Sequence, residues 1–144
     1  MKGRGIPRPW IYSTGAYPKN QYLCSISENS MRINLCNIGK YQQLNDVVLQ
    51  CLYALCRLGH SVEVLPKVRG DGVVNILFGA HCISSQSQLP PGTIIYNFEQ
   101  SVSSYFHHDY VSLLQEAETV WDYSESNAKR LRELWGIEAE VVFP

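Results

Sequence analysis

The chain has 144 residues, a formal net charge of −1 and a hydrophobic content of 45%. Its length suits a single domain with a sizeable core, and a charge so close to zero gives no electrostatic reason to expect binding to nucleic acid or to a membrane surface. The first thirty residues lack the apolar segment of a signal peptide, and no apolar run approaches the roughly 20 residues that cross a bilayer. We therefore expect a cytoplasmic protein without a membrane span.

The beginning of the chain differs in composition from the rest. Residues 1–21 combine glycine, proline and aromatic residues with the basic residues Lys2, Arg4, Arg8 and Lys19. Basic and aromatic side chains together can hold a phosphate chain, although scattered charges of this kind are more typical of a solvated terminus. We predict a basic and aromatic arm over residues 1–21 and one domain over residues 22–144, in which residues 22–27 form a weakly extended segment.

The cysteines show no recognisable disulfide or metal-binding pattern. Their number is odd and no two are spaced as CxxC, whereas zinc sites use closely spaced ligands. We predict no metal site and no cofactor, and we expect reduced, buried thiols, as is usual in the cytoplasm. The five residues are Cys24, Cys36, Cys51, Cys56 and Cys82.

An alternation of strand-like and helix-like segments begins after the arm. Residues 31–38 alternate in polarity up to Gly39, which predicts a strand. Residues 41–58 repeat apolar side chains at helical spacing, and Gly59 follows as a residue that tolerates a left-handed helix end. Residues 60–66 read as a second strand. Such a strand–helix–strand unit is parallel and right-handed.

The remainder of the domain continues this alternation. Ser124 can cap a helix and Gly136 can end one, while the loop over residues 82–92 is too short for a full crossover helix. The order of elements predicts an α/β fold, a Rossmann-like three-layer sandwich around a mostly parallel sheet of about six strands. The further predicted strands cover residues 73–78, 93–98, 119–122 and 138–143, and the further helices cover residues 102–117 and 124–136.

Two ionisable residues follow buried strands and are candidates for catalysis. Ligands of open α/β sheets bind outside the carboxyl ends of the strands. Glu99 follows the fourth predicted strand, where apolar surroundings suit a carboxylate to general-base work; the alternative is a capping or ion-paired carboxylate. His81 ends the third strand and could take a proton or orient a hydroxyl; the alternative is a loop histidine bonded to the backbone.

Five further residues at strand ends are candidates for substrate binding. The N–H groups at a helix start can hold an anion, but two of these residues can equally serve as helix caps. No GxGxxG fingerprint or Walker A loop is present, which disfavours dinucleotide binding. The candidates are Asn37 and Gly39 after the first strand, Asn97 at the end of the fourth, and Ser124 and Asn127 after the fifth.

Three segments together resemble one family. Residues 121–136 (WDYSESNAKRLRELWG) and 139–144 (AEVVFP) resemble the end of the N-terminal domain of GT-B-fold glycosyltransferases, where a strand leads to Ser-x-x-Asn, a basic helix, and a strand that ends in proline. Residues 75–81 (NILFGAH) and 89–100 (LPPGTIIYNFEQ) resemble the preceding strands of some bacterial members. The resemblance extends over residues 32–144.

The resemblance implies the acceptor-binding half of a glycosyltransferase, with strand order 3-2-1-4-5-6. In the family, the nucleotide-sugar donor binds chiefly in a C-terminal half, which this chain lacks. On that analogy Glu99 or His81 is the base, and Asn37 and Gly39 border the cleft. The implied partners are a nucleotide sugar and an acceptor, once a second domain or subunit is supplied, so we expect this chain to be incomplete as an enzyme on its own.

Two other functions fit the same residues. The first is a stand-alone, non-catalytic Rossmann-like module that binds a nucleotide, a sugar or a protein partner, including a second copy of the chain. The second is a small nucleoside-processing enzyme with Glu99 as its nucleophile.

Overall fold

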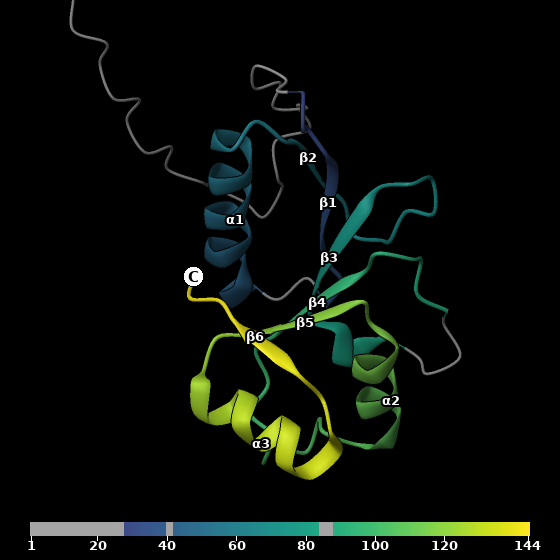
Figure 1. The fold of residues 1–144 in the computed structure, drawn as a ribbon, viewed down its shortest axis with the longest axis vertical. Helices are drawn as coiled ribbons and strands as arrows, with labels where there is room; N and C mark the ends of the chain where they lie inside the picture. Colours follow the sequence, from purple (N-terminus) through teal and green to yellow (C-terminus); the bar gives the residue numbers. More distant parts are fainter. Residues whose placement is uncertain (1–27, 40–41, 84–87) are drawn as a thin grey trace, which may run out of the picture.

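The computed structural model describes residues 28–39, 42–83 and 88–144, so the predicted arm and the segment 22–27 lie outside the described residues. These residues build one six-stranded sheet in which every pairing is parallel (Figure 1). The α/β fold predicted from the sequence is therefore confirmed. The strands are β1 (Arg32–Asn37), β2 (Ser61–Val64), β3 (Val74–Phe78), β4 (Ile94–Asn97), β5 (Thr119–Asp122) and β6 (Ala139–Val141).

Helices cover both faces of the sheet. The helix α1 (Asn45–Arg57) packs on one face, and α2 (His108–Glu116) and α3 (Glu125–Trp135) pack on the other (Figure 1). Two single 3-10 turns, η1 (Gln42–Leu44) and η2 (Ala80–Cys82), follow β1 and β3. The described chain is thus a three-layer sandwich, as its pattern of elements predicts.

The ends of α3 follow the local sequence signals. The Ser124 hydroxyl accepts a hydrogen bond from the Asn127 amide at 3.3 Å, and Gly136 ends the helix with φ of 65°. The start of α2 is different, because the predicted start at residue 102 is wrong. Residues 100–106 form turns, and the helix begins after His107, whose backbone is extended. The Nδ1 atom of His107 accepts a hydrogen bond from the Tyr110 amide at 3.3 Å and so caps the helix.

The strand order differs from the one that the resemblance implies. The sheet runs β2-β1-β3-β4-β5-β6, so β3 pairs with β1, and the expected order 3-2-1-4-5-6 is wrong. Residues 65–73 lead the chain from β2 across β1, so that β3 pairs with β1 on the side opposite β2, and β4, β5 and β6 are added beyond β3. The winding direction therefore reverses between β1 and β3, and the carboxyl ends of these two strands flank the switch point of the sheet.

Buried asparagines hold the connection that crosses β1. Asn34 and Asn75 are opposite each other in β1 and β3, are fully buried, and share a 2.9 Å hydrogen bond. The Asn34 amide also donates to the Lys67 carbonyl at 2.9 Å, while Asn75 accepts from the Arg69 amide at 2.8 Å and donates to the Arg69 carbonyl at 2.7 Å. These contacts satisfy backbone groups of a connection that has no helix of its own.

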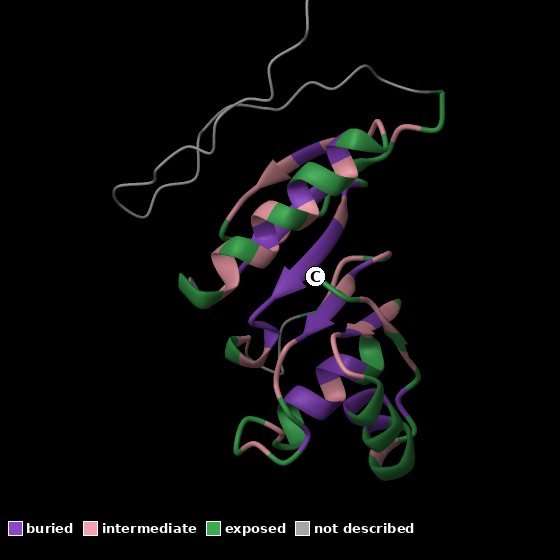
Figure 2. Cartoon of the chain, turned by 90° about the vertical axis from the view of Figure 1, so that its left-hand side faces the viewer, coloured by how far each residue is buried: buried purple, intermediate pink, exposed green. Residues whose placement is uncertain are grey.

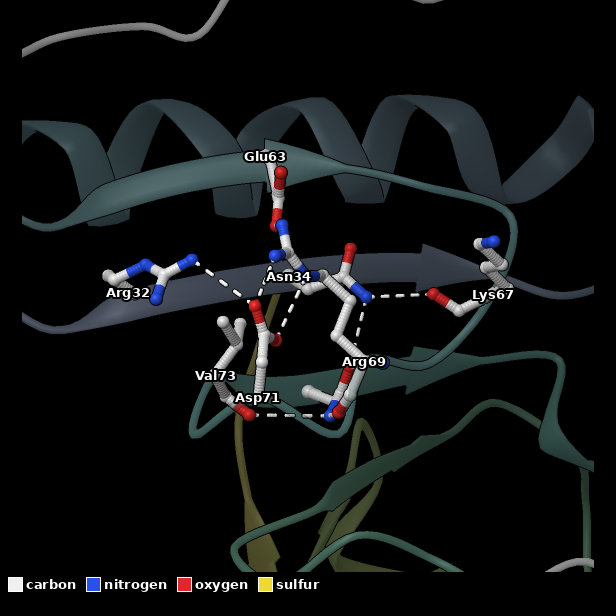
Figure 3. Close-up of polar contacts among 8 residues, drawn as sticks. Arg32, Asn34, Glu63, Lys67, Arg69, Asp71 and Val73 are labelled. Atoms are coloured by element: carbon white, nitrogen blue, oxygen red, sulfur yellow. Dashed lines mark hydrogen bonds and ion pairs between the residues drawn. The ribbon is translucent and has the colours of Figure 1, made fainter.

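Charged side chains of this connection also form ion pairs with residues of β1 and β2. The Arg69 guanidinium lies between the carboxylates of Glu63 and Asp71, and Arg32 reaches Asp71 at 3.5 Å (Figure 3). The hydrogen bond from Arg69 lowers the pKa of Asp71, and the hydrogen bonds to Asp71 and Glu63 raise the pKa of Arg69. Ion pairs that keep contact with solvent contribute little to stability.

The core divides between the two faces of the sheet. Alternate residues of each strand point to opposite faces. Ile33, Leu35 and Ile76 pack with α1, whereas Cys36, Leu77 and Ile95 pack with α2 and α3. Figure 2 shows the central strands almost entirely buried and α1 with only its inner face buried.

The described cysteines are thiols, as expected, but they are not all buried. Burial raises the pKa of Cys36 to about 12 and that of Cys51 to about 11. Cys82 is exposed, so the prediction of burial is wrong for it, because it lies at the surface end of η2. Cys24 lies outside the described residues.

Candidate active site at the carboxyl edge

The carboxyl edge of the sheet brings the two candidate bases together. His81 lies in η2 directly after β3, at the switch point, and Glu99 follows β4, the next strand of the sheet. The Nδ1 atom of His81 is 3.5 Å from Oε1 of Glu99. Parallel neighbouring strands place the residues that follow them side by side at one edge, which accounts for this proximity.

Their exposure separates the two candidates. The His81 side chain is 4% exposed and the Glu99 side chain is 25% exposed. Glu99 is therefore the group that a ligand can contact, and His81 lies behind it. The His81 ring packs against Tyr105, with ring centroids 4.6 Å apart, and against the edge of Tyr110.

Burial also sets the protonation of His81. Desolvation lowers its pKa below the usual 6.5, and the negative charge of Glu99 counteracts part of this effect. The imidazole is accordingly neutral near pH 7. In that state it can orient the Glu99 carboxylate through a hydrogen bond without neutralising it by a full positive charge.

The backbone of Glu99 is held by two side-chain amides. The Asn97 Oδ1 atom accepts from the Glu99 amide at 3.1 Å, and its Nδ2 donates to the Glu99 carbonyl at 2.9 Å. Asn127 Nδ2 donates to the same carbonyl at 3.1 Å. Glu99 thus has a fixed main chain and a partly exposed carboxylate, which is the arrangement that a positioned general base requires.

Asn97 and Asn127, predicted as substrate-binding residues, belong to this internal support. They are 1% and 6% exposed, and both donate to the buried carboxylate of Asp122, at 2.8 and 2.7 Å. Sequence reasoning did not single out Asp122. The available signal is its position as an ionisable residue at the end of the apolar strand β5. A carboxylate that is buried there needs polar partners, so it predicts a cluster of polar side chains around it.

The other predicted binding residues lie in different surroundings. Asn37 is 4% exposed, and its side chain donates to Asn45 Oδ1 at the start of α1, at 3.3 Å. Gly39 lies in the turn after β1, at the switch point, and is partly exposed. Ser124 caps α3 and its hydroxyl is 2.9 Å from that of Ser126. The structure thus brings Glu99, His81, Asn97 and Asn127 into one cluster, while Asn37 forms its hydrogen bond with the first residue of α1.

A pocket opens at the segment that follows Glu99, although Glu99 is not one of its lining residues. It has a volume of about 220 Å³, and Gln100, Ser101, Ser124, Ser126 and Arg130 are among the residues that line it. The Arg130 Nε atom donates to the Ser101 hydroxyl at 3.0 Å. The lining is mainly polar and contains one guanidinium, so it is suited to a polar or anionic group rather than to an apolar one.

Neither a metal centre nor a membrane segment is found in the described parts of the chain. Within residues 28–39, 42–83 and 88–144, no group of three or more His, Cys, Asp or Glu side chains could hold a metal ion. In the same ranges, none of the helices combines the length and the apolar character needed to cross a bilayer. No protein-family model, no curated protein and no solved structure matches this chain.

Proposed function

We propose that this chain is the acceptor-binding half of a sugar-transfer enzyme, with Glu99 as the general base. The observation that carries the proposal is the state of Glu99: its main chain is fixed by Asn97 and Asn127, its carboxylate is partly exposed, and His81 supports it from behind at 3.5 Å. A carboxylate in this setting can accept a proton from a hydroxyl group that is bound above the carboxyl edge.

The chemical step assigns one role to this chain and another to the donor half. As the acceptor oxygen forms its bond to the anomeric carbon, the bond from that carbon to the nucleoside diphosphate breaks, and the proton of the acceptor hydroxyl passes to Glu99. The pocket beside Gln100 and Arg130 offers polar groups to the rest of the acceptor. Stabilising the charge on the departing diphosphate falls to the donor half.

Titration calorimetry with a panel of methyl glycosides and hydroxylated acceptors tests this proposal. A hydrogen bond from a hydroxyl to a carboxylate is stronger than one to a neutral amide, so E99Q should weaken binding of the preferred acceptor by about tenfold. E118Q removes an exposed carboxylate before β5, at the opposite edge of the sheet, and should leave the affinity unchanged. Equal affinities for wild type and E99Q would remove Glu99 as the contact to the acceptor.

The second candidate is the non-catalytic binding module, and the pocket is the observation that favours it. A polar pocket next to the Arg130 guanidinium fits the phosphate of a nucleotide without any chemistry at Glu99. Under this alternative, R130Q abolishes binding of a free nucleotide and E99Q leaves it unchanged. Binding of glycosides but not of free nucleotides would favour the transfer enzyme instead.

A further inference from the structure

Asp122 is the one Asp, Glu, Lys or Arg residue that is buried in the described parts of the chain, with no exposed surface. Its Oδ1 atom accepts from the Ser124 amide at 2.9 Å, and its Oδ2 accepts from Asn97 and Asn127 at 2.8 and 2.7 Å. Burial raises its pKa above the ordinary value, and these donors offset only part of that rise. Because every partner is a donor, the geometry is that of an ionised carboxylate.

The two side-chain amides that donate hydrogen bonds to Asp122 are the same two that hold the backbone of Glu99. The Nδ2 atom of Asn97 donates to both the Asp122 carboxylate and the Glu99 carbonyl, and the Nδ2 atom of Asn127 does the same. The oxygen of each amide is also engaged. Asn97 Oδ1 accepts from the Tyr110 hydroxyl at 2.7 Å, and Asn127 Oδ1 accepts from the Ser101 amide at 2.8 Å.

These contacts fix which way both amides point. An asparagine amide can be turned over at little cost unless its neighbours distinguish oxygen from nitrogen. The Asp122 carboxylate makes that distinction, because it can only accept. With the amides turned over, two oxygens would face a buried carboxylate, and the Glu99 carbonyl would lose both of its donors.

We propose that Asp122 is a positioning residue for Glu99, which it orients through the buried amides of Asn97 and Asn127. It contacts no ligand itself. This inference rests on the proposed function for its purpose, but the geometry that carries it holds whether or not a sugar binds.

The titration of His81 reports on this positioning. In the part of the chain that the structure describes, the titratable side chains that bear on the imidazole include Glu99 after β4, His107 at the start of α2, and the neighbouring Tyr105 and Tyr110. The charge of Glu99 raises the pKa of His81. If Asp122 holds Glu99 in place, D122N loosens Glu99 and the pKa of His81 falls. We expect no such fall when Glu99 has already been replaced.

The experiment is an NMR titration of the His81 ring in wild type, D122N, E99Q and the double variant, with E125Q as the control for loss of an exposed negative charge at the start of α3. The proposal predicts a lower pKa of His81 in D122N, no change in E125Q, and no further change when D122N is added to E99Q. A fall of the same size in the E99Q background would overturn it, since Asp122 would then act on His81 directly. An unchanged pKa in D122N would overturn it as well.

Amide hydrogen exchange provides a second measurement for the case in which D122N is poorly folded. N127A removes one of the two amides and leaves the contact between Asn97 and Asp122. We expect exchange of the Glu99 amide to become about tenfold faster in N127A, while the amide of Leu35 in β1 keeps its wild-type rate. Unchanged exchange at Glu99, or equal acceleration at Leu35, would contradict positioning. Neither readout needs a ligand, so failure of acceptor binding would count against the proposed function alone.

Discussion

His81 and Glu99 face each other at the carboxyl edge of the sheet, with Nδ1 and Oε1 3.5 Å apart, but only Glu99 has substantial contact with solvent. The pair joins the switch point between β1 and β3 to the end of β4. This arrangement gives the two residues unequal roles. Glu99 is the group that can meet a substrate, and His81 is the neutral partner that supports it.

The burial of His81 predicts a pH dependence of stability. Its pKa in the folded chain lies below the unfolded value of 6.5, so the unfolded chain takes up the proton first as the pH falls. The stabilisation is complete above pH 6.5 and is lost as the pH falls through the folded pKa. H81N should therefore show a smaller loss of unfolding free energy than wild type between about pH 7.5 and about pH 5.5, measured by urea denaturation. H108N, which replaces a 95% exposed side chain, should match wild type; an H81N slope equal to that of wild type would contradict the prediction.

The hydroxyl of Tyr110 should contribute to stability through Asn97. Tyr110 is 2% exposed, burial raises its pKa, and its protonated hydroxyl donates to Asn97 Oδ1 at 2.7 Å. Y110F should lower the free energy of unfolding by about 1 kcal/mol, measured by urea denaturation. The same change at Tyr53, which is 54% exposed on α1, should have no effect. Equal stabilities of Y110F and wild type would show that this hydrogen bond is not important.

Asn75 should be one of the most sensitive positions of the chain. Its side-chain nitrogen donates to the carbonyls of Arg69 and Val73, at 2.7 and 3.3 Å. N75D keeps the volume of the side chain but places an oxygen against these carbonyls, and should cost about 3 kcal/mol or more of unfolding free energy. R69A leaves the backbone groups of residue 69 in place and should cost clearly less, because the ion pairs that it removes lie at the surface. The reverse ranking in urea denaturation would mean that these ion pairs, and not the asparagine, hold this connection.

Alanine substitutions at two glycines distinguish the effect of backbone strain from that of steric contact. A Cβ atom at Gly136 or at Gly70 would meet nothing within 4 Å, but only Gly136 has a positive φ, of 65°. G136A should therefore destabilise the chain by about 1 kcal/mol. G70A should be neutral or slightly stabilising, since alanine restricts the unfolded chain. Thermal unfolding of the two variants measures the difference, and equal melting temperatures would contradict the assignment.

Most of the elements could be predicted from the sequence because their signals are local. Ser124 and Gly136 mark the ends of α3, and the buried strands are apolar runs of the expected length. The start of α2 could not be found in this way, since Val102 and Tyr105 continue an apolar pattern through residues that form turns. What ends that pattern is the capping contact between His107 and Tyr110.

The strand order and the support of Glu99 depend on contacts between distant parts of the chain. Asn34 and Asn75 hold the loop that leads β3 to the side of β1, and these residues are 41 positions apart. Asn97 ends β4 and Asn127 lies in the first turn of α3, so both resemble binding residues from the sequence. Their contacts follow from Asp122, which is 25 residues from Asn97 and meets both side chains only in the folded chain. Local patterns carry no information on such contacts.

The location of acceptor binding tests the central claim most directly. An NMR titration of the ¹⁵N-labelled wild-type chain with the best-binding methyl glycoside shows which amides respond. We predict that the largest shift changes lie at residues 79–81 and 98–101, which form the carboxyl ends of β3 and β4 and one side of the pocket. Changes confined to other parts of the chain, or no change with any glycoside of the panel, would contradict the assignment of this edge as the acceptor site.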